Sequence, residues 1–255
     1  SEVDTRSLVS YIRDKGVMNV LISSDVNNIE SLKLELKKAP SMKGLDLSSF
    51  VSTSEPYDIG ENNSKYRVAV FDFGIKKNII RCLENRGVYM KVFPFDTEAS
   101  EILNWKPTGI FFSNGPGDPS SMKNVIKNIE IILQKNIPIF GICLGHQLLA
   151  LASGLKTYKM HNGHRGINHP VLNLNTKKCE VTSQNHGFSI DEDSLNGKNN
   201  IIITHRNLND NTVEGIMFTD KPFFSVQYHP ESSPGPQDSR YLFDQFVSNM
   251  DKYID

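Results

Sequence analysis

The chain has 255 residues, of which 28 are Lys or Arg and 29 are Asp or Glu, giving a formal net charge of -1 at pH 7. This length is enough for one large α/β domain and a smaller unit, whose cores need no disulfide or metal. Charges of both signs are scattered, so the sequence lacks the basic surface of a protein that binds nucleic acid or anionic membranes. No apolar run approaches the ~20 residues of a membrane span, and no targeting segment opens the chain. We expect a soluble enzyme or partner protein.

The cysteine content indicates a reducing compartment. Cys82, Cys143 and Cys179 are widely spaced and form no C-x-x-C pair, which fits neither a disulfide framework nor a zinc site. We therefore expect a cytoplasmic protein without a metal site. The first residue is Ser1 rather than Met, and we expect the chain to be a piece of a longer protein.

The first 66 residues have the pattern of a small unit followed by a linker. Apolar residues at helical spacing between residues 8 and 15 precede a strand-like run at 17–22, and a second short helix is expected at 29–38. The polar stretch 48–65 contains Pro56 and Gly60 and is typical of a connection between domains. We expect an amino-terminal unit at 1–50, a linker at 51–66 and the main domain at 67–255.

From residue 67 onward, short apolar strands alternate with amphipathic helices, which predicts an α/β fold with a mostly parallel sheet. Strands are expected at 68–73, 88–93, 109–113 and 138–142, and helices at 76–85, 97–104 and a stretch ending near 135. Later strands are expected at 171–174, 179–183, 201–205, 215–218 and 223–227, with a terminal helix at 239–250. In open sheets of this kind, ligands bind at the carboxyl ends of the strands.

The most informative stretch is residues 138–147, an apolar strand that turns at Cys143 directly into a helix. Gly141 and Gly145 stand two residues to either side of the cysteine, the spacing of a strained turn that presents a nucleophile above a sheet. Unpaired backbone N–H groups and the positive end of the helix dipole stabilise a thiolate there. A buried, inert cysteine is the alternative for an isolated thiol, but the partners found elsewhere in the chain favour the nucleophile.

A thiol nucleophile needs a base and a group that orients the base. His229 and Glu231 follow an expected strand, and Pro230 keeps the backbone extended so that both side chains project to the same side. We predict His229 as the base and Glu231 as its orienting carboxylate. Of the other histidines, His146 is expected to pack or hydrogen-bond locally, His186 to lie in a pocket loop at 184–188, and His161, His164, His169 and His205 to lie at the surface or behind the site.

Acyl transfer also needs N–H donors for the developing oxyanion. The N–H of Leu144, directly after the nucleophile, is one candidate, and the N–H of Gly117 in the loop 114–119 is the second. An ordinary turn is the alternative interpretation of this loop, which has neither the P-loop pattern nor the dinucleotide-binding pattern.

Three separated motifs, at 114–119, 141–147 and 229–231, together resemble the class I (triad-type) glutamine amidotransferases. More narrowly, the chain resembles the glutaminase, or small-subunit, family of carbamoyl-phosphate synthetases. The stretches that carry this narrower match are 3–6, 12–16, 72–79, 183–188 and 211–236. The resemblance covers nearly the whole chain and implies a flavodoxin-like amidotransferase domain at 67–255, preceded at 1–50 by a truncated form of the family's amino-terminal domain.

The resemblance implies glutamine hydrolysis through a glutamyl thioester. Cys143 would attack the carboxamide carbon, His229 would protonate the leaving ammonia, and Glu231 would hold the imidazole. The residues implied to hold glutamine are Gly115, Gly117, Leu144, Gln147, Asn185, Gly187 and Phe188.

The resemblance further implies that the ammonia serves carbamoyl-phosphate synthesis, for pyrimidine or arginine biosynthesis. The partner would be a synthetase large subunit or fused ATP-grasp synthetase domains, where ATP, Mg and bicarbonate are expected. No cofactor is expected in this chain, and neither nucleic acid nor membrane is an expected partner.

Two alternatives remain open. One is a non-catalytic, glutaminase-like module that binds or regulates a synthetase, and the intact Cys143, His229 and Glu231 speak against it. The other is a stand-alone γ-glutamyl hydrolase. The segment 4–6 speaks against that alternative, because a free-standing hydrolase has no use for a synthetase-docking domain.

Overall fold

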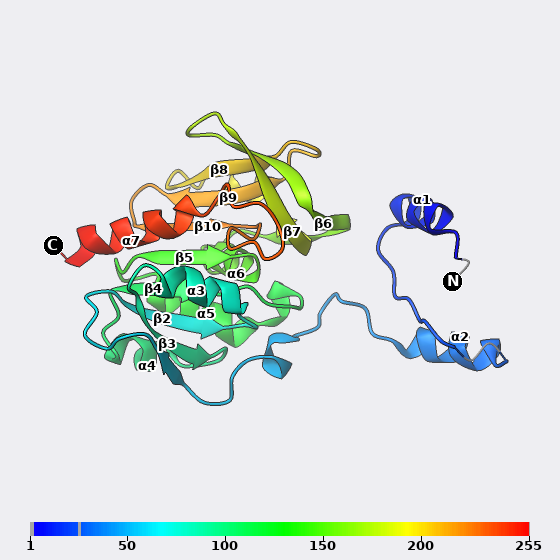
Figure 1. Ribbon diagram of the computed structural model, residues 1–255, viewed down its shortest axis with the longest axis horizontal. Helices are drawn as coiled ribbons and strands as arrows, with labels where there is room; N and C mark the ends of the chain where they lie inside the picture. The colour runs from blue at the N-terminus through cyan, green and yellow to red at the C-terminus, as the bar shows by residue number, and fades with distance from the viewer. Residues whose placement is uncertain (1–2, 25–26, 255) are drawn as a thin grey trace.

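The computed structural model describes residues 3–24 and 27–254, and its centre is one ten-stranded sheet (Figure 1). The ends of the expected units at Ser1 and Asp255 lie outside the described residues. The strands are β1 (Tyr57–Ile59), β2 (Arg67–Asp72), β3 (Tyr89–Pro94), β4 (Gly109–Phe112), β5 (Ile139–Ile142), β6 (Thr157–Asn173), β7 (Cys179–Ile190), β8 (Ile201–Asn207), β9 (Val213–Phe218) and β10 (Phe223–Val226). The helices are α1 (Thr5–Lys15), α2 (Ile29–Lys38), α3 (Lys77–Glu84), α4 (Ala99–Asn104), α5 (Lys123–Ile132), α6 (Leu144–Ala152) and α7 (Tyr241–Ile254).

The strands lie in the order β1-β3-β2-β4-β5-β10-β9-β8-β6-β7. From β3 through β10 the neighbours pair in parallel, while β1 and all strands beyond β10 pair antiparallel. The parallel part has the order of a flavodoxin-like sheet, whose ligands bind at the carboxyl ends of the strands. The expected α/β fold is therefore confirmed, with a larger antiparallel extension than the sequence indicated.

The parallel strands are buried on both faces, because helices cover each side. Along β2, Val68 and Val70 pack in the cluster that contains α3 and α7, whereas Ala69 and Phe71 pack in the cluster that contains α4, α5 and α6. This alternation follows from the two-residue period of a strand. It produces a three-layer domain in which the strand ends, rather than the faces, are free to form a site.

The hairpin β6–β7 is longer than the sequence predicts. The sequence indicates strands only at 171–174 and 179–183 and a loop at 184–188, but the stretch 184–188 lies within β7. The apolar alternation that marks a strand is missing here because several buried side chains are polar, among them His164 and Gln184, which both bond Glu214 on β9. Pattern reasoning on hydrophobicity cannot detect such a strand.

The amino-terminal part follows the prediction in its helices but not in its strand. The helices α1 and α2 form as expected and bury no residue. The run 17–22 is no strand, although its first residue bonds to the hairpin, from Val17 N to His161 O at 2.9 Å. The expected linker 51–66 contributes the edge strand β1, which pairs with β3. Among the helices of the described residues, none is long and apolar enough to cross a membrane.

Phe140 is the aromatic centre of the core on one face of the sheet. Its ring stacks on Phe224 at 4.5 Å and meets the edges or tilted faces of Phe111, Phe243 and Phe246. We expect Phe140→Ala to lower the free energy of unfolding by about 3–5 kcal/mol, because it removes buried area and leaves a cavity. Chemical denaturation measures the loss. Ile131→Ala, at a side chain that is 52% exposed, is the control and should cost less than about 0.5 kcal/mol; equal losses would contradict the assignment of the core.

Candidate active site

The turn at Cys143 joins β5 directly to α6 and holds the cysteine in a strained conformation. Its φ is 55° and its ψ is -103°, a combination that non-glycine residues rarely adopt. The N–H of Cys143 donates to Val226 O at 2.9 Å, which ties the turn to the end of β10. The thiol thus lies at the first turn of α6 and at the carboxyl edge of the sheet. The predicted elbow is confirmed.

Glycine is needed next to the elbow because α6 begins against the end of β4. A Cβ on Gly145 would lie 2.2 Å from Phe112 O. A Cβ on Gly141 would lie 2.9 Å from Gly145 O. Neither approach is compatible with a side chain, so both glycines are required by close packing of backbone against backbone.

His229 and Glu231 lie just beyond β10 and face each other. Nδ1 of His229 and Oε1 of Glu231 are 2.8 Å apart, and both side chains are buried. The backbone of His229 is held by a bond from its N–H to Ser183 O at 2.9 Å. The imidazole interacts with the Cys143 thiol on its other side. The structure therefore brings the predicted nucleophile, base and orienting carboxylate into one constellation.

The electrostatics of this constellation favour a protonated imidazole. Burial alone would lower the pKa of His229, but its interactions with Glu231 and Cys143 outweigh burial and raise it to about 10. Burial likewise tends to raise the pKa of Glu231, while His229 and Lys76 hold it below its usual value. A negative thiolate beside a positive imidazole is the reactive form of a thiol nucleophile.

Lys76 is a member of the site that the sequence did not reveal. Its Nζ lies 2.9 Å from Oε1 of Glu231 and donates to Ser232 O at 2.8 Å. It stands in the loop between β2 and α3, at the same edge of the sheet as Cys143. Its position after a strand places Lys76 at the edge where the site lies, but the sequence does not indicate which carboxylate it contacts. Lys76 therefore helps to neutralise a carboxylate that is completely buried.

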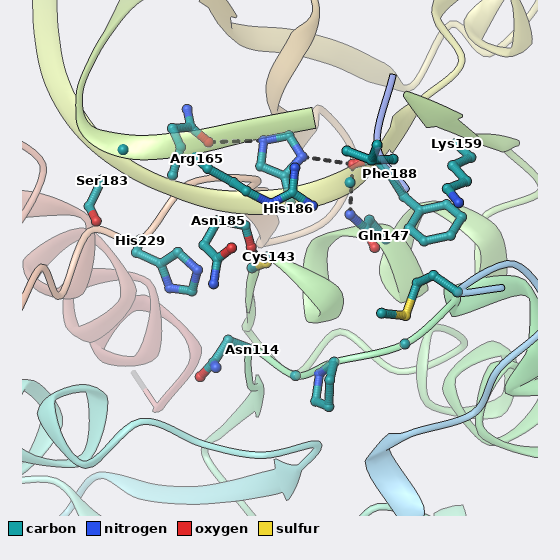
Figure 2. A pocket seen from close by; sticks show the side chains of 18 of the residues that line it. Asn114, Cys143, Gln147, Lys159, Arg165, Ser183, Asn185, His186, Phe188 and His229 are labelled. Carbon is teal, nitrogen blue, oxygen red and sulfur yellow. Dashed lines mark hydrogen bonds between the residues drawn. The ribbon is translucent and has the colours of Figure 1, made fainter. Parts of the chain in front are cut away.

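A cavity of about 920 Å³ opens in front of the triad. Its lining contains Cys143 and His229 together with most of the residues that the resemblance assigned to glutamine: Gly115, Gly117, Gln147, Asn185, Gly187 and Phe188. Figure 2 shows Cys143, His229, Asn185 and Gln147 around this space. Leu144 is the exception, since its side chain is buried in the core and only its backbone is next to the nucleophile.

The side-chain amide of Gln147 is held in place by two hydrogen bonds. Its amide NH₂ donates to Phe188 O at 3.0 Å and to Gln227 Oε1 at 2.9 Å. Its amide oxygen therefore remains for a ligand. On the facing strand, Asn185 O lies 4.0 Å from Sγ of Cys143. These contacts place the start of α6 and the 185–188 segment of β7 against each other across the pocket.

The N–H groups of Leu144 and Gly117 are the predicted donors to the oxyanion. Neither the N–H of Leu144 nor that of Gly117 donates to an acceptor among residues 3–24 and 27–254. Gly115 lies nearer to the elbow than Gly117, because a Cβ added to Gly115 would lie 2.8 Å from the Leu144 side chain, whereas one added to Gly117 would meet Leu45 and Leu47. The role of Gly117 as the second donor thus stays a prediction, with Gly115 as a neighbouring candidate.

A second feature that the sequence did not reveal is a strap formed by residues 41–48. The strap crosses the loop 114–119: Gly44 N donates to Asp118 Oδ2 at 2.8 Å, and Asp118 N donates to Leu45 O at 2.8 Å. Ser41 and Met42 line the pocket. The strap therefore supports the glycine loop and forms part of the pocket wall.

The histidines outside the triad fall largely as predicted. His146 is buried, and its Nδ1 lies 2.8 Å from Ser225 Oγ, so it bonds locally rather than acting as the base. His186 lines the pocket. His164 and His205 are not surface residues, because both are buried in hydrogen-bonded groups behind the site. The sequence could not distinguish them, since their partners come from other strands.

Comparison with known proteins agrees with this geometry. The family model of class-I glutamine amidotransferases matches residues 69–249. The chain is 50% identical to the carbamoyl phosphate synthase small chain of Chlorobaculum tepidum over 98% of this chain and 68% of that protein. It is 50% identical to the small chain of Clostridium acetobutylicum over 96% of this chain and 68% of that protein. It is 44% identical to the small chain of Escherichia coli O6:H1 over 99% of this chain and 70% of that protein.

The fold also matches a solved structure. A Thermoplasma acidophilum protein, provisionally described as part of a GMP synthase, superposes with a TM-score of 0.65 at 23% identity and covers 74% of this chain and 95% of its own. At this identity the match supports the fold alone. The curated relatives are longer, and the chain spans about two thirds of their length. On the family model and on these relatives, the chain belongs to the class-I glutamine amidotransferases and, within them, to the carbamoyl phosphate synthase small chains.

Proposed function

We propose that this chain is the glutamine-hydrolysing component of a carbamoyl phosphate synthase, with Cys143 as nucleophile, His229 as acid and base, and Glu231 as the group that orients His229. The observation that carries the proposal is the constellation itself. A strained cysteine at a helix start, a buried imidazole and a buried carboxylate meet at the mouth of a cavity of about 920 Å³. Family membership supplies the substrate class, glutamine.

In the first half of the reaction, the thiolate of Cys143 attacks the side-chain carboxamide carbon of glutamine. The negative charge that develops on the carboxamide oxygen is stabilised by the N–H of Leu144 and a second N–H from the glycine loop. The C–N bond then breaks, and the imidazolium of His229 gives its proton to the leaving nitrogen. The products of this half are ammonia and a glutamyl thioester on Cys143.

In the second half, neutral His229 accepts a proton from water as the water oxygen attacks the thioester carbon. The C–S bond breaks, glutamate leaves, and the thiolate and imidazolium are restored. Glu231 keeps Nδ1 of His229 directed toward itself throughout, so the other ring nitrogen faces the thiol and the substrate. We propose that the chain needs no cofactor for these steps, because thiol, imidazole and backbone donors supply every group they use.

We further propose that the ammonia is passed to a synthetase partner, either a large subunit or fused ATP-grasp domains, where ATP, Mg and bicarbonate would bind. The relatives are named small chains, which supports a partner chain in general. The three cysteines are free, which supports a reducing, cytoplasmic setting. The non-catalytic module and the stand-alone hydrolase are disfavoured by the assembled triad and by family membership, respectively.

Replacement of the nucleophile tests the assignment directly. We expect Cys143→Ala, in complex with the synthetase partner, to release glutamate from glutamine at less than about one thousandth of the parent rate, because no thioester can form. Carbamoyl phosphate synthesis from added ammonia should persist. Cys179→Ala, at an exposed cysteine outside the pocket, should retain the parent rate. Glutamate release by Cys143→Ala at that rate would refute the proposal.

The pH dependence of the reaction tests the roles of His229 and Glu231. The imidazolium that protonates the leaving nitrogen persists until the pH approaches its pKa of about 10, so the alkaline fall in the rate of glutamate release should come as pH rises through that value. Glu231→Gln removes the charge that raises this pKa, and we expect the fall to begin at least ~1 pH unit lower. Glu130→Gln, at an exposed position on α5, is the control. An unchanged alkaline limb in Glu231→Gln would contradict the assigned role.

A further inference from the structure

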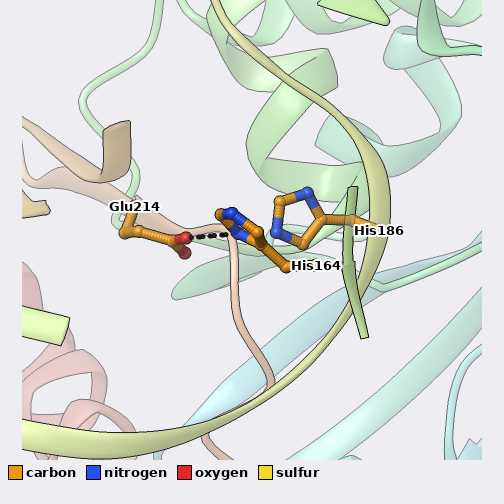
Figure 3. A group of neighbouring side chains, drawn as sticks. All are labelled: His164, His186 and Glu214. Atoms are coloured by element: carbon orange, nitrogen blue, oxygen red, sulfur yellow. Dashed lines mark hydrogen bonds and ion pairs between the residues drawn. The ribbon is translucent and has the colours of Figure 1, made fainter. Parts of the chain in front are cut away.

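Behind the pocket, a buried carboxylate receives hydrogen bonds from three strands. Glu214 on β9 is completely buried, and Figure 3 shows it beside His164 and His186. Its Oε1 lies 3.1 Å from Nδ1 of His164 and accepts from Asn207 Nδ2 at 3.1 Å, while its Oε2 accepts from Gln184 Nε2 at 3.0 Å. No step of the proposed reaction uses this residue.

The bonds of Glu214 continue to the pocket wall through two further side chains. Because the carboxylate takes the amide NH₂ of Gln184, the amide oxygen of Gln184 faces Nε2 of His186, at 3.0 Å. On the other side of the ring, Nδ1 of His186 lies 2.8 Å from Phe188 O. Burial lowers the pKa of His186 to about 4, so the neutral ring has one N–H and donates to only one of these two oxygens. Phe188 O is the same atom that accepts from Gln147 at 3.0 Å. Figure 2 shows this last part of the path at the pocket.

The groups around Glu214 favour its charged form. Burial tends to lower the pKa of His164, but the bonds to Glu214 and Asp210 outweigh it and raise that pKa. Burial tends to raise the pKa of Glu214, yet His164, His186, Gln184 and Asn207 hold it below its usual value. Both oxygens of Glu214 are also hydrogen-bonded, which is the arrangement that makes a buried charge tolerable.

A metal ion is not the better interpretation of this cluster. Ligand atoms of His164, His186 and Glu214 lie within 4.8 Å of one another, which is compatible with a bound cation. However, each ring nitrogen of both histidines already has an oxygen neighbour, at distances between 2.8 and 3.1 Å. A cation would have to displace the His164 to Glu214 pair and would leave a ring without its partners.

We propose that Glu214 is a positioning residue of the glutamine pocket, which fixes the Gln184 amide and thereby holds His186 and the Phe188 carbonyl in the geometry that binds the substrate. The inference rests on the proposed function. It assigns the stiffness of the 185–188 segment to a residue that does not line the cavity. Removing the carboxylate frees the Gln184 amide and His186, so the segment beside Cys143 loses its fixed position while the triad stays intact.

Glutamate release by the complex with the synthetase partner tests this inference. We expect Glu214→Ala to raise the KM for glutamine about 10-fold or more and to change kcat by less than about 3-fold, because buried bonds to the binding segment are lost and none to the triad. Glu214→Gln keeps the shape of the side chain and one acceptor oxygen and replaces the other oxygen by an NH₂ donor; it should restore KM to within about 3-fold of the parent value.

The control separates positioning from stability. Glu180 on β7 is also a buried carboxylate. It accepts from the side chains of Tyr241, Ser239, Asn173 and, at 3.5 Å, Tyr228, and none of these side chains lines the pocket. Glu180→Ala should lower Tm as much as Glu214→Ala and leave KM within about 2-fold. If Glu214→Ala does not fold, Gln184→Met breaks the same path at its next residue without removing the charge beside His164, and it should raise KM similarly.

The outcomes distinguish the two proposals. A parent complex that releases no glutamate from glutamine refutes the proposed function and this inference with it. A parent complex that hydrolyses glutamine, combined with a parental KM in Glu214→Ala or in Gln184→Met, refutes only the role of Glu214. An equal rise of KM in Glu180→Ala also refutes it, because the effect would then follow general loss of stability.

Discussion

The contact between Gly145 and the end of β4 is the constraint on which the site depends. Helix α6 can begin at residue 144 only because its second residue has no side chain, and a Cβ there would lie 2.2 Å from a carbonyl oxygen. This close approach forces the chain to turn within one residue, and Cys143 takes the strained conformation that results. The core offsets the strain, since β5 is buried along its whole length and α6 along nearly all of its own. The thiol is therefore held by the sheet rather than by a loop.

The second requirement of the site is that the buried charge of Glu231 be stabilised. Glu231 is completely buried, and a buried carboxylate without partners costs several kcal/mol. His229 and Lys76 meet the same oxygen of Glu231, from 2.8 and 2.9 Å. Glu231 can thus stay ionised, and its charge raises the pKa of His229. Lys76 therefore lowers the cost of burying the charge of Glu231, the carboxylate predicted to orient His229.

The sequence predicts the parts of this site that are local and misses the parts that are not. The elbow and the His229 to Glu231 pair each lie within a few residues, where glycine spacing and a proline constrain the backbone. Lys76 meets a carboxylate that is distant in the sequence, so no local pattern could pair them. The strap of residues 41–48 likewise bonds Asp118, which is distant in the sequence, so no local pattern could predict that contact. The second half of β7 escapes pattern reasoning for a different reason: two of its buried side chains, Gln184 and His186, are polar, so hydrophobic alternation does not reveal a strand there.

The two walls of the pocket differ in how firmly they are held. The triad and the 185–188 segment belong to strands, their ends and α6, whose backbone bonds are part of the sheet and whose side chains are mostly buried. The opposite wall contains residues 17–19 and 41–42, which are not in strands, and the helices that flank them, α1 and α2, bury no residue. Segments with few buried contacts open at lower free energy than a sheet. The predicted catalytic residues therefore belong to the wall formed by the sheet and α6, whereas the other wall is joined to the hairpin β6–β7 by contacts such as the hydrogen bond from Val17 N to His161 O.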